Sequence, residues 1–168
     1  MDTWVFDKVK AFLGSAKTDK DLDTALRRNQ VVFFLHLLGL DTHGHSHRPH
    51  SAEYLANIAS VDRGIQEVVE LLEDFYHHDQ KTAYLFTADH GMNDRGAHGD
   101  GDPQNTETPL VAWGAGLAKP GEELVESVHS AKEIERTRSW NLDPLQRKDV
   151  SQADIAPLMV LSGYYFPR

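Results

Sequence analysis

Two short apolar runs on either side of one long amphipathic stretch constrain the fold most strongly. Residues 31–38 read Val-Val-Phe-Phe-Leu-His-Leu-Leu, and residues 82–87 read Thr-Ala-Tyr-Leu-Phe-Thr. A nearly continuous run of this kind is typical of a strand buried on both faces, as in a parallel sheet covered by helices. Between the runs, Ser51 can cap a helix in which apolar residues recur every three or four positions from Tyr54 to Phe75. Strand, helix and strand predict a crossover unit, and therefore an α/β fold with a mostly parallel sheet flanked by helices.

Other periodic segments predict three further elements. Residues 4–13 have helical spacing, and Gly14 follows as a C-cap. Residues 109–113 are expected to form a short third strand between glycine-rich turns. A last helix is expected to open at Ser151, in a sequence typical of a capping box, and to close at Gly163.

Composition narrows the classes of protein. The chain has 168 residues, 40% of them hydrophobic, which is enough for one domain with a core. Its 17 basic and 26 acidic residues give a net charge of −9, which disfavours nucleic acid as a partner and suits bound cations. There is no cysteine, so thiolate zinc sites and cysteine nucleophiles are excluded. No window holds the about 18 apolar residues of a membrane helix, and no basic segment typical of a signal peptide is present.

Histidine and aspartate follow both predicted strands. Asp41 and His45 come after the first run, and Asp89 and His90 come after the second. Ligands of open α/β sheets gather at the carboxyl ends of the strands, and zinc accepts imidazole nitrogen and carboxylate oxygen. His98, in a glycine-rich loop, can fold back as a further ligand. The sequence therefore predicts a metal site built without thiolates.

The remaining histidines of this region have simpler interpretations. His36 lies inside the first apolar run and is expected to be a packed core residue. The histidine-rich residues 41–50 are expected to form a loop that ends at Arg48-Pro49.

Several strings of the sequence together resemble the alkaline phosphatase superfamily and, within it, the ethanolamine phosphate transferases of GPI-anchor synthesis. The metal-binding core of the superfamily resembles residues 40–45 (Leu-Asp-Thr-His-Gly-His), 87–92 (Thr-Ala-Asp-His-Gly-Met) and 98–99 (His-Gly). The transferases are similar in the longer strings 33–41, 44–49, 108–116 and 154–159.

The resemblance implies two divalent metal ions, expected to be zinc. One ion would be held by Asp41, His45 and His98, and the other by Asp89 and His90 with a further Asp and a Thr or Ser nucleophile from an earlier strand. No residue of this chain has the context expected of that nucleophile. The chain is therefore expected to be the C-terminal part of a single alkaline phosphatase-like catalytic domain, whose N-terminal part is absent, and to be inactive alone.

The implied reaction moves phosphoethanolamine from phosphatidylethanolamine to the first mannose of a GPI precursor, in the lumen of the endoplasmic reticulum. The full-length relatives are embedded in the membrane, and both substrates are lipids. His43, His47 and Arg48 are then candidates for the rim of the substrate pocket. Arg48 either holds a phosphate oxygen or pairs with a surface acid.

Two alternative functions remain open from the sequence. The same metal ligands would serve a phosphodiesterase or sulfatase-type hydrolase of the superfamily. A non-catalytic zinc-binding module would also account for the histidines without a nucleophile.

Overall fold

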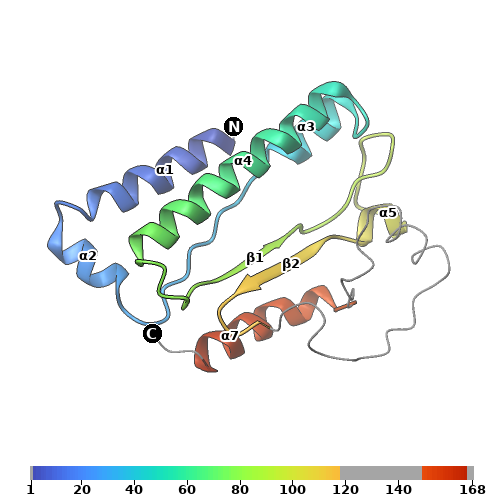
Figure 1. Ribbon diagram of the computed structural model, residues 1–168. Coiled ribbons are helices and arrows are strands. Elements are labelled where there is room, and N and C mark those ends of the chain that lie inside the picture. Colours follow the sequence, from blue (N-terminus) through green and yellow to red (C-terminus); the bar gives the residue numbers. More distant parts are fainter. Residues whose placement is uncertain (1, 118–148, 166–168) are drawn as a thin grey trace.

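Helices dominate the part of the chain that the computed structural model describes, residues 2–117 and 149–165 (Figure 1). α4 and α7 lie on opposite sides of the two strands in Figure 1. The elements are α1 (Asp2–Ser15), α2 (Lys20–Leu26), α3 (Gly39–His47), α4 (Ala52–Phe75), β1 (Ala83–Thr87), α5 (Pro103–Thr106), β2 (Leu110–Gly114), η1 (Gln152–Asp154) and α7 (Ile155–Tyr165).

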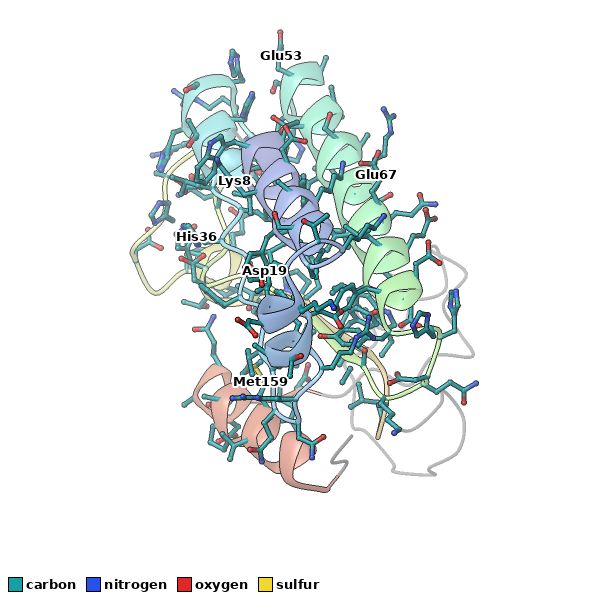
Figure 2. The ribbon with its side chains drawn as sticks, turned by 90° about the vertical axis from the view of Figure 1, so that its left-hand side faces the viewer. Lys8, Asp19, His36, Glu53, Glu67 and Met159 are labelled. Carbon is teal, nitrogen blue, oxygen red and sulfur yellow. The ribbon has the colours of Figure 1, made fainter. Side chains whose placement is uncertain are left out.

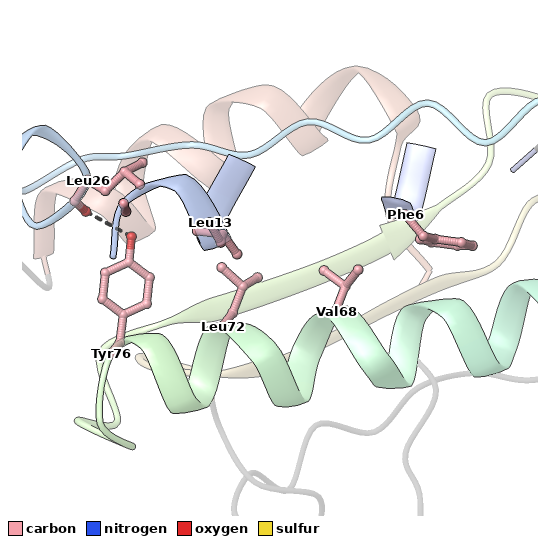
Figure 3. Close-up of a cluster of buried hydrophobic side chains, with 7 residues drawn as sticks. Phe6, Leu13, Leu26, Val68, Leu72 and Tyr76 are labelled. Carbon is pink, nitrogen blue, oxygen red and sulfur yellow. Dashed lines mark hydrogen bonds between the residues drawn. The ribbon is translucent and has the colours of Figure 1, made fainter. Parts of the chain in front are cut away.

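The core lies where α1 and α2 pack against α4 (Figure 3). Leu13 of α1 is 1% exposed, and the hydroxyl of Tyr76 donates a hydrogen bond of 2.8 Å to the carbonyl of Leu26. The buried residues of this cluster are Phe6, Leu13, Ala16, Leu26, Val68, Leu72 and Tyr76. The helical spacing of apolar residues predicted from the sequence is what brings these side chains to one face.

The long helix α4 begins as predicted. The Ser51 hydroxyl accepts a hydrogen bond of 3.1 Å from the backbone N–H of Tyr54, so Ser51 is the N-cap. Gly64 lies inside the helix because Phe6 packs against it. A Cβ on Gly64 would lie 2.1 Å from Cε2 of the Phe6 ring, so any side chain there would displace that ring.

The sheet differs from the prediction. The predicted strands 82–87 and 109–113 are present as β1, which begins one residue later, and β2, which is displaced by one residue at both ends. They pair antiparallel, from Ala83 opposite Gly114 to Thr87 opposite Leu110. Within the described residues they form a sheet of two strands, so a mostly parallel sheet is not observed.

Residues 31–38 form neither a helix nor a strand in this structure. Phe33 and Leu35 pack against the core, whereas Phe34 is 86% exposed, so the prediction of burial on both faces is wrong. His36, which is labelled in Figure 2, is also exposed, so it is not a core residue. The reason is that helices cover the segment on one side only. Among the described residues, the backbone groups of residues 31–37 have no hydrogen-bond partner.

Three local predictions also need correction. The histidine-rich residues predicted as a loop are mostly helical, because α3 extends to His47. Ser151 makes no side-chain capping bond, so the capping box is absent. Gly163 lies within α7, which continues to Tyr165. In the two described stretches, no helix has both the length and the apolar character needed to cross a membrane.

Candidate metal centre

Helix α3 carries the central residues of the site. Asp41 lies in its first turn, and His45 follows four residues later on the same face. The helix ends where Arg48, with a φ of 75°, donates its backbone N–H to the carbonyl of Gly44 at 3.0 Å. Gly44 itself allows close packing, because a Cβ there would lie 2.2 Å from the Met92 sulfur. The helix thereby packs directly onto the loop that follows β1.

Three histidine rings surround one carboxylate oxygen. The Oδ1 atom of Asp41 lies 3.2 Å from Nε2 of His98, 3.3 Å from Nε2 of His45 and 3.9 Å from Nε2 of His90. The rings of His90 and His98 are stacked, and the Nε2 atoms of His45 and His98 are 3.1 Å apart. The structure thus brings together four of the five predicted metal ligands.

The Oδ1 atom of Asp41 has no hydrogen-bond donor among the described residues. The same oxygen is also buried. A buried carboxylate oxygen without a hydrogen bond is costly unless a cation compensates it. One ligand atom each from Asp41, His90 and His98 lie within 4.8 Å of one another, and nitrogen and oxygen donors of this kind suit zinc. These residues therefore fit a divalent metal ion.

Backbone carbonyls orient two of the rings. Nδ1 of His45 lies 2.7 Å from the carbonyl oxygen of Gly96, and Nδ1 of His90 lies 2.9 Å from that of Gly91. A carbonyl oxygen only accepts hydrogen bonds, so each Nδ1 carries the hydrogen and, in the neutral ring, Nε2 presents its lone pair. Both lone pairs belong to the atoms that lie near Asp41, as a metal site requires.

Asp89 lies at the edge of this cluster, where its Oδ1 is 3.8 Å from Nε2 of His90. Its side chain is 79% exposed, and its Oδ1 accepts a hydrogen bond of 3.1 Å from the backbone N–H of His90. The Gln152 side chain holds the backbone here, donating to the carbonyls of Ala88 at 3.0 Å and Asp89 at 2.8 Å. Sequence reasoning missed Gln152, since nothing in the sequence relates it to a residue 63 positions earlier.

The predicted substrate residues face other directions. His43 and His47 each lie two residues from a cluster residue, which is about 200° around the helix, and their ring centroids are 5.7 Å apart. Arg48 donates from Nη1 to the carbonyl of His45 at 2.7 Å. It therefore supports the end of α3, and no described acid pairs with it.

Tyr54 is a second residue that the sequence did not indicate. Burial and the nearby Asp41 carboxylate raise the pKa of its phenol. It also packs under α3, since its ring lies 3.4 Å from the position of a Cβ on Gly44. The phenol is therefore neutral at ordinary pH and adds no negative charge beside Asp41.

Comparison with known proteins places this centre in a family. Residues 2–106 match the family model described as type I phosphodiesterase / nucleotide pyrophosphatase, and the chain belongs to that family. This agrees with the predicted resemblance to the alkaline phosphatase superfamily.

Relatives with a specific name are also similar over nearly the whole chain. A GPI ethanolamine phosphate transferase 1 of Chaetomium globosum is 56% identical over 168 residues, which are 99% of this chain and 18% of that protein. Proteins of the same name from Mus musculus and Yarrowia lipolytica are 50% and 49% identical, with the same coverage. The predicted resemblance is confirmed, and the chain spans less than a fifth of the length of these relatives. No solved structure matches the chain.

Proposed function

We propose that this chain is part of the catalytic domain of an ethanolamine phosphate transferase of GPI-anchor synthesis. The observation that carries the proposal is a buried, unpartnered Asp41 oxygen facing three imidazole nitrogens, in a chain similar over 99% of its length to proteins of that name. The reaction would move phosphoethanolamine from phosphatidylethanolamine to the first mannose of a GPI precursor. The enzyme would act at the endoplasmic reticulum membrane, on its luminal side.

Two zinc ions form the metal centre of this proposal. One is held by Asp41, His45 and His98, and the other by His90 and Asp89. The nearly parallel rings of His90 and His98, with centroids 3.7 Å apart, support two ions, because each ring can serve a different ion and two-metal sites place ions about 4 Å apart. Asp89 Oδ1 lies 3.8 Å from Nε2 of His90, so a rotation of the exposed carboxylate brings it to the same ion.

Bound zinc would activate the nucleophile and neutralise charge on the phosphoryl oxygens. The residues of this chain would hold the ions and orient the metal ligands. The carbonyls of Gly96 and Gly91 fix the rings of His45 and His90 with their Nε2 atoms inward. The guanidinium of Arg48 has further N–H groups besides the one bound to His45, and these would hold a phosphate oxygen. His43 and His47 would line the outer rim, and the nucleophile would come from residues outside this chain.

The fold proposal concerns residues 31–38. We infer that they are a strand of a larger, mostly parallel sheet, which other residues of the catalytic domain complete. The alternating burial of the segment supports this, as does the absence of backbone–backbone hydrogen bonds from residues 31–37 to any part of the chain that the structure describes. Amide hydrogen exchange of residues 31–37 should then be fast in this chain and at least tenfold slower in a longer polypeptide that contains the whole domain. Equally fast exchange in both would contradict the strand.

The metal centre is tested by zinc titration of the chain with calorimetry. The unchanged chain is expected to bind zinc, and Asp41→Ala to lose most of that binding, because Asp41 contributes the central oxygen. Asp62→Ala is the matched control, since it removes an exposed carboxylate from α4. Equal binding by the Asp41 and Asp62 variants would remove Asp41 from the site.

Activity separates the candidate functions. A longer polypeptide that includes the whole domain should transfer phosphoethanolamine to a mannose acceptor, and Asp41→Ala should abolish the transfer. The family match of residues 2–106 favours hydrolysis of a phosphodiester or nucleotide as the second candidate. Release of ethanolamine phosphate or nucleotide to water without any acceptor product would support that candidate. Full transfer activity in the Asp41 variant would remove Asp41 from the catalytic site, and a domain with neither transfer nor hydrolysis would support the non-catalytic zinc module.

A further inference from the structure

A buried carboxylate at the start of the chain contacts the start of α3. Asp2 is 5% exposed, and its Oδ1 accepts a hydrogen bond of 2.8 Å from the backbone N–H of Gly39. Its second oxygen, Oδ2, is buried without a hydrogen-bond partner among the described residues. The two residues are 37 positions apart in the sequence. Burying a carboxylate is costly, so this contact is expected to have a structural role.

The contact caps the N-terminus of α3, for which the neighbouring residues of the sequence offer no side chain. The residue at the N-cap position of α3 is Leu38, which offers no side-chain acceptor. The first N–H groups of a helix have no partner within the helix, and a carboxylate near them is stabilised by the helix dipole. Asp2 therefore caps α3 from another helix.

The surroundings of Asp2 hold it firmly in place. α1 is fixed to α4 through Phe6, which lies against Gly64, and through the fully buried Leu13. Gly39 leaves room for the carboxylate, because a Cβ on it would lie 1.9 Å from Asp2 Oδ2. The cap thus stands on a helix that contributes two buried side chains to the core, Phe6 and Leu13.

We propose that Asp2 is a positioning residue for the metal centre, which fixes the first turn of α3 and with it the carboxylate of Asp41. Asp41 is only two residues beyond Gly39, in the turn that Asp2 caps. A ligand held by a rigid neighbour binds metal more tightly than one on a frayed helix end. The proposal rests on the metal centre described under the proposed function.

Zinc titration of the 168-residue chain tests the proposal. Asp2→Ala removes the acceptor, and zinc affinity should fall about tenfold or more, as for other groups that orient metal ligands. Asp2→Asn keeps an oxygen at the Oδ1 position and should bind zinc nearly as well as the unchanged chain. If Asp2 only stabilised the fold, zinc affinity would fall equally in other variants that lose a helix cap.

The control removes a comparable cap elsewhere. Asp19 accepts hydrogen bonds from the backbone N–H groups of Asp21 and Leu22 at the start of α2, which lies at the other end of α4 from α3 (Figures 1 and 2). Asp19→Ala should lower the unfolding midpoint without changing zinc affinity. Unchanged zinc affinity in Asp2→Ala, or an equal loss in Asp2→Asn, would overturn the proposal.

A measurement without metal separates this inference from the proposed function. In the zinc-free chain, amide hydrogen exchange of residues 39–43 should be faster in Asp2→Ala than in Asp2→Asn. A chain that binds no zinc but shows this difference would disprove the metal centre and leave Asp2 as the cap of α3. Equal exchange in both variants would overturn the cap itself.

Discussion

The imidazole rings of His90 and His98 stack, with their centroids 3.7 Å apart and 19° between their planes. Their Nε2 atoms lie 3.9 Å and 3.2 Å from the same oxygen of Asp41. Both rings thus present a nitrogen to one carboxylate oxygen, and imidazole nitrogen with carboxylate oxygen is a donor set that suits zinc.

His98→Ala should reduce the number of zinc ions that the chain binds. One of the two proposed sites loses a ligand, while His90 and Asp89 remain for the other. Calorimetric titration gives the number bound and the affinity. His50→Ala is the matched control, because His50 forms an exposed pair with Asp94 at 2.9 Å. Loss of zinc in both variants would indicate nonspecific binding to exposed histidines.

Gly64→Ala should destabilise the chain although alanine favours helices. The new Cβ would overlap the buried ring of Phe6, and overpacking of this kind costs about 1 to 3 kcal/mol. Gly14→Ala should instead stabilise by up to about 1 kcal/mol, because no atom lies within 4 Å of its Cβ position. Urea unfolding gives the free energy of unfolding of both variants. The same change in the two variants would contradict the packing of Phe6 on α4.

Leu13→Ala should lower the free energy of unfolding by about 2 to 5 kcal/mol, since it opens a cavity in the core. Leu13 is 1% exposed, whereas Leu55 is 56% exposed. Leu55→Ala should therefore change stability by no more than about 0.5 kcal/mol. Similar losses in the two variants would mean that the core does not lie between α1 and α4.

Glu67→Gln should make stability less dependent on pH in the acid range. The Lys10 ammonium donates a hydrogen bond to Glu67 and holds the pKa of this carboxyl below 4.5. The depressed pKa contributes stability above the pKa of the unfolded chain, and the contribution disappears as pH falls through the folded value.

Unfolding midpoints at pH 7 and pH 3 measure this effect. The unchanged chain should lose slightly more stability on acidification than Glu67→Gln does. Asp62→Asn, a neutralised acid elsewhere on α4, controls for net charge. An identical loss in the unchanged chain and in Glu67→Gln would show that the pair with Lys10 does not form in solution.

The long helices could be predicted because their signals are local. The apolar spacing of residues 4–13 and the cap of Ser51 lie within a few positions of the structure that they specify. The grouping of the candidate ligands was predictable from residue types at two points of the sequence. Asp41 with His45 and His90 follow the two apolar runs, and the structure brings them together with His98.

The features that the sequence did not reveal depend on distant partners. α3 was missed because its cap is Asp2, and its glycines and histidines are typical of a loop. The antiparallel pairing of β1 with β2 was missed because an apolar run does not specify its neighbour. Residues 31–38 have the composition of a buried strand, but burial of their second face requires atoms from elsewhere.

The hydrogen bonds of Gln152 also fix an order of assembly during synthesis. Ribosomes add about 5 to 20 residues per second, so Gln152 is made about 3 to 13 s after Asp89. Asp2, in contrast, exists before any part of α3 is made. The capped helix can therefore form early on the nascent chain, whereas the loop after β1 gains the Gln152 amide only after a delay of seconds.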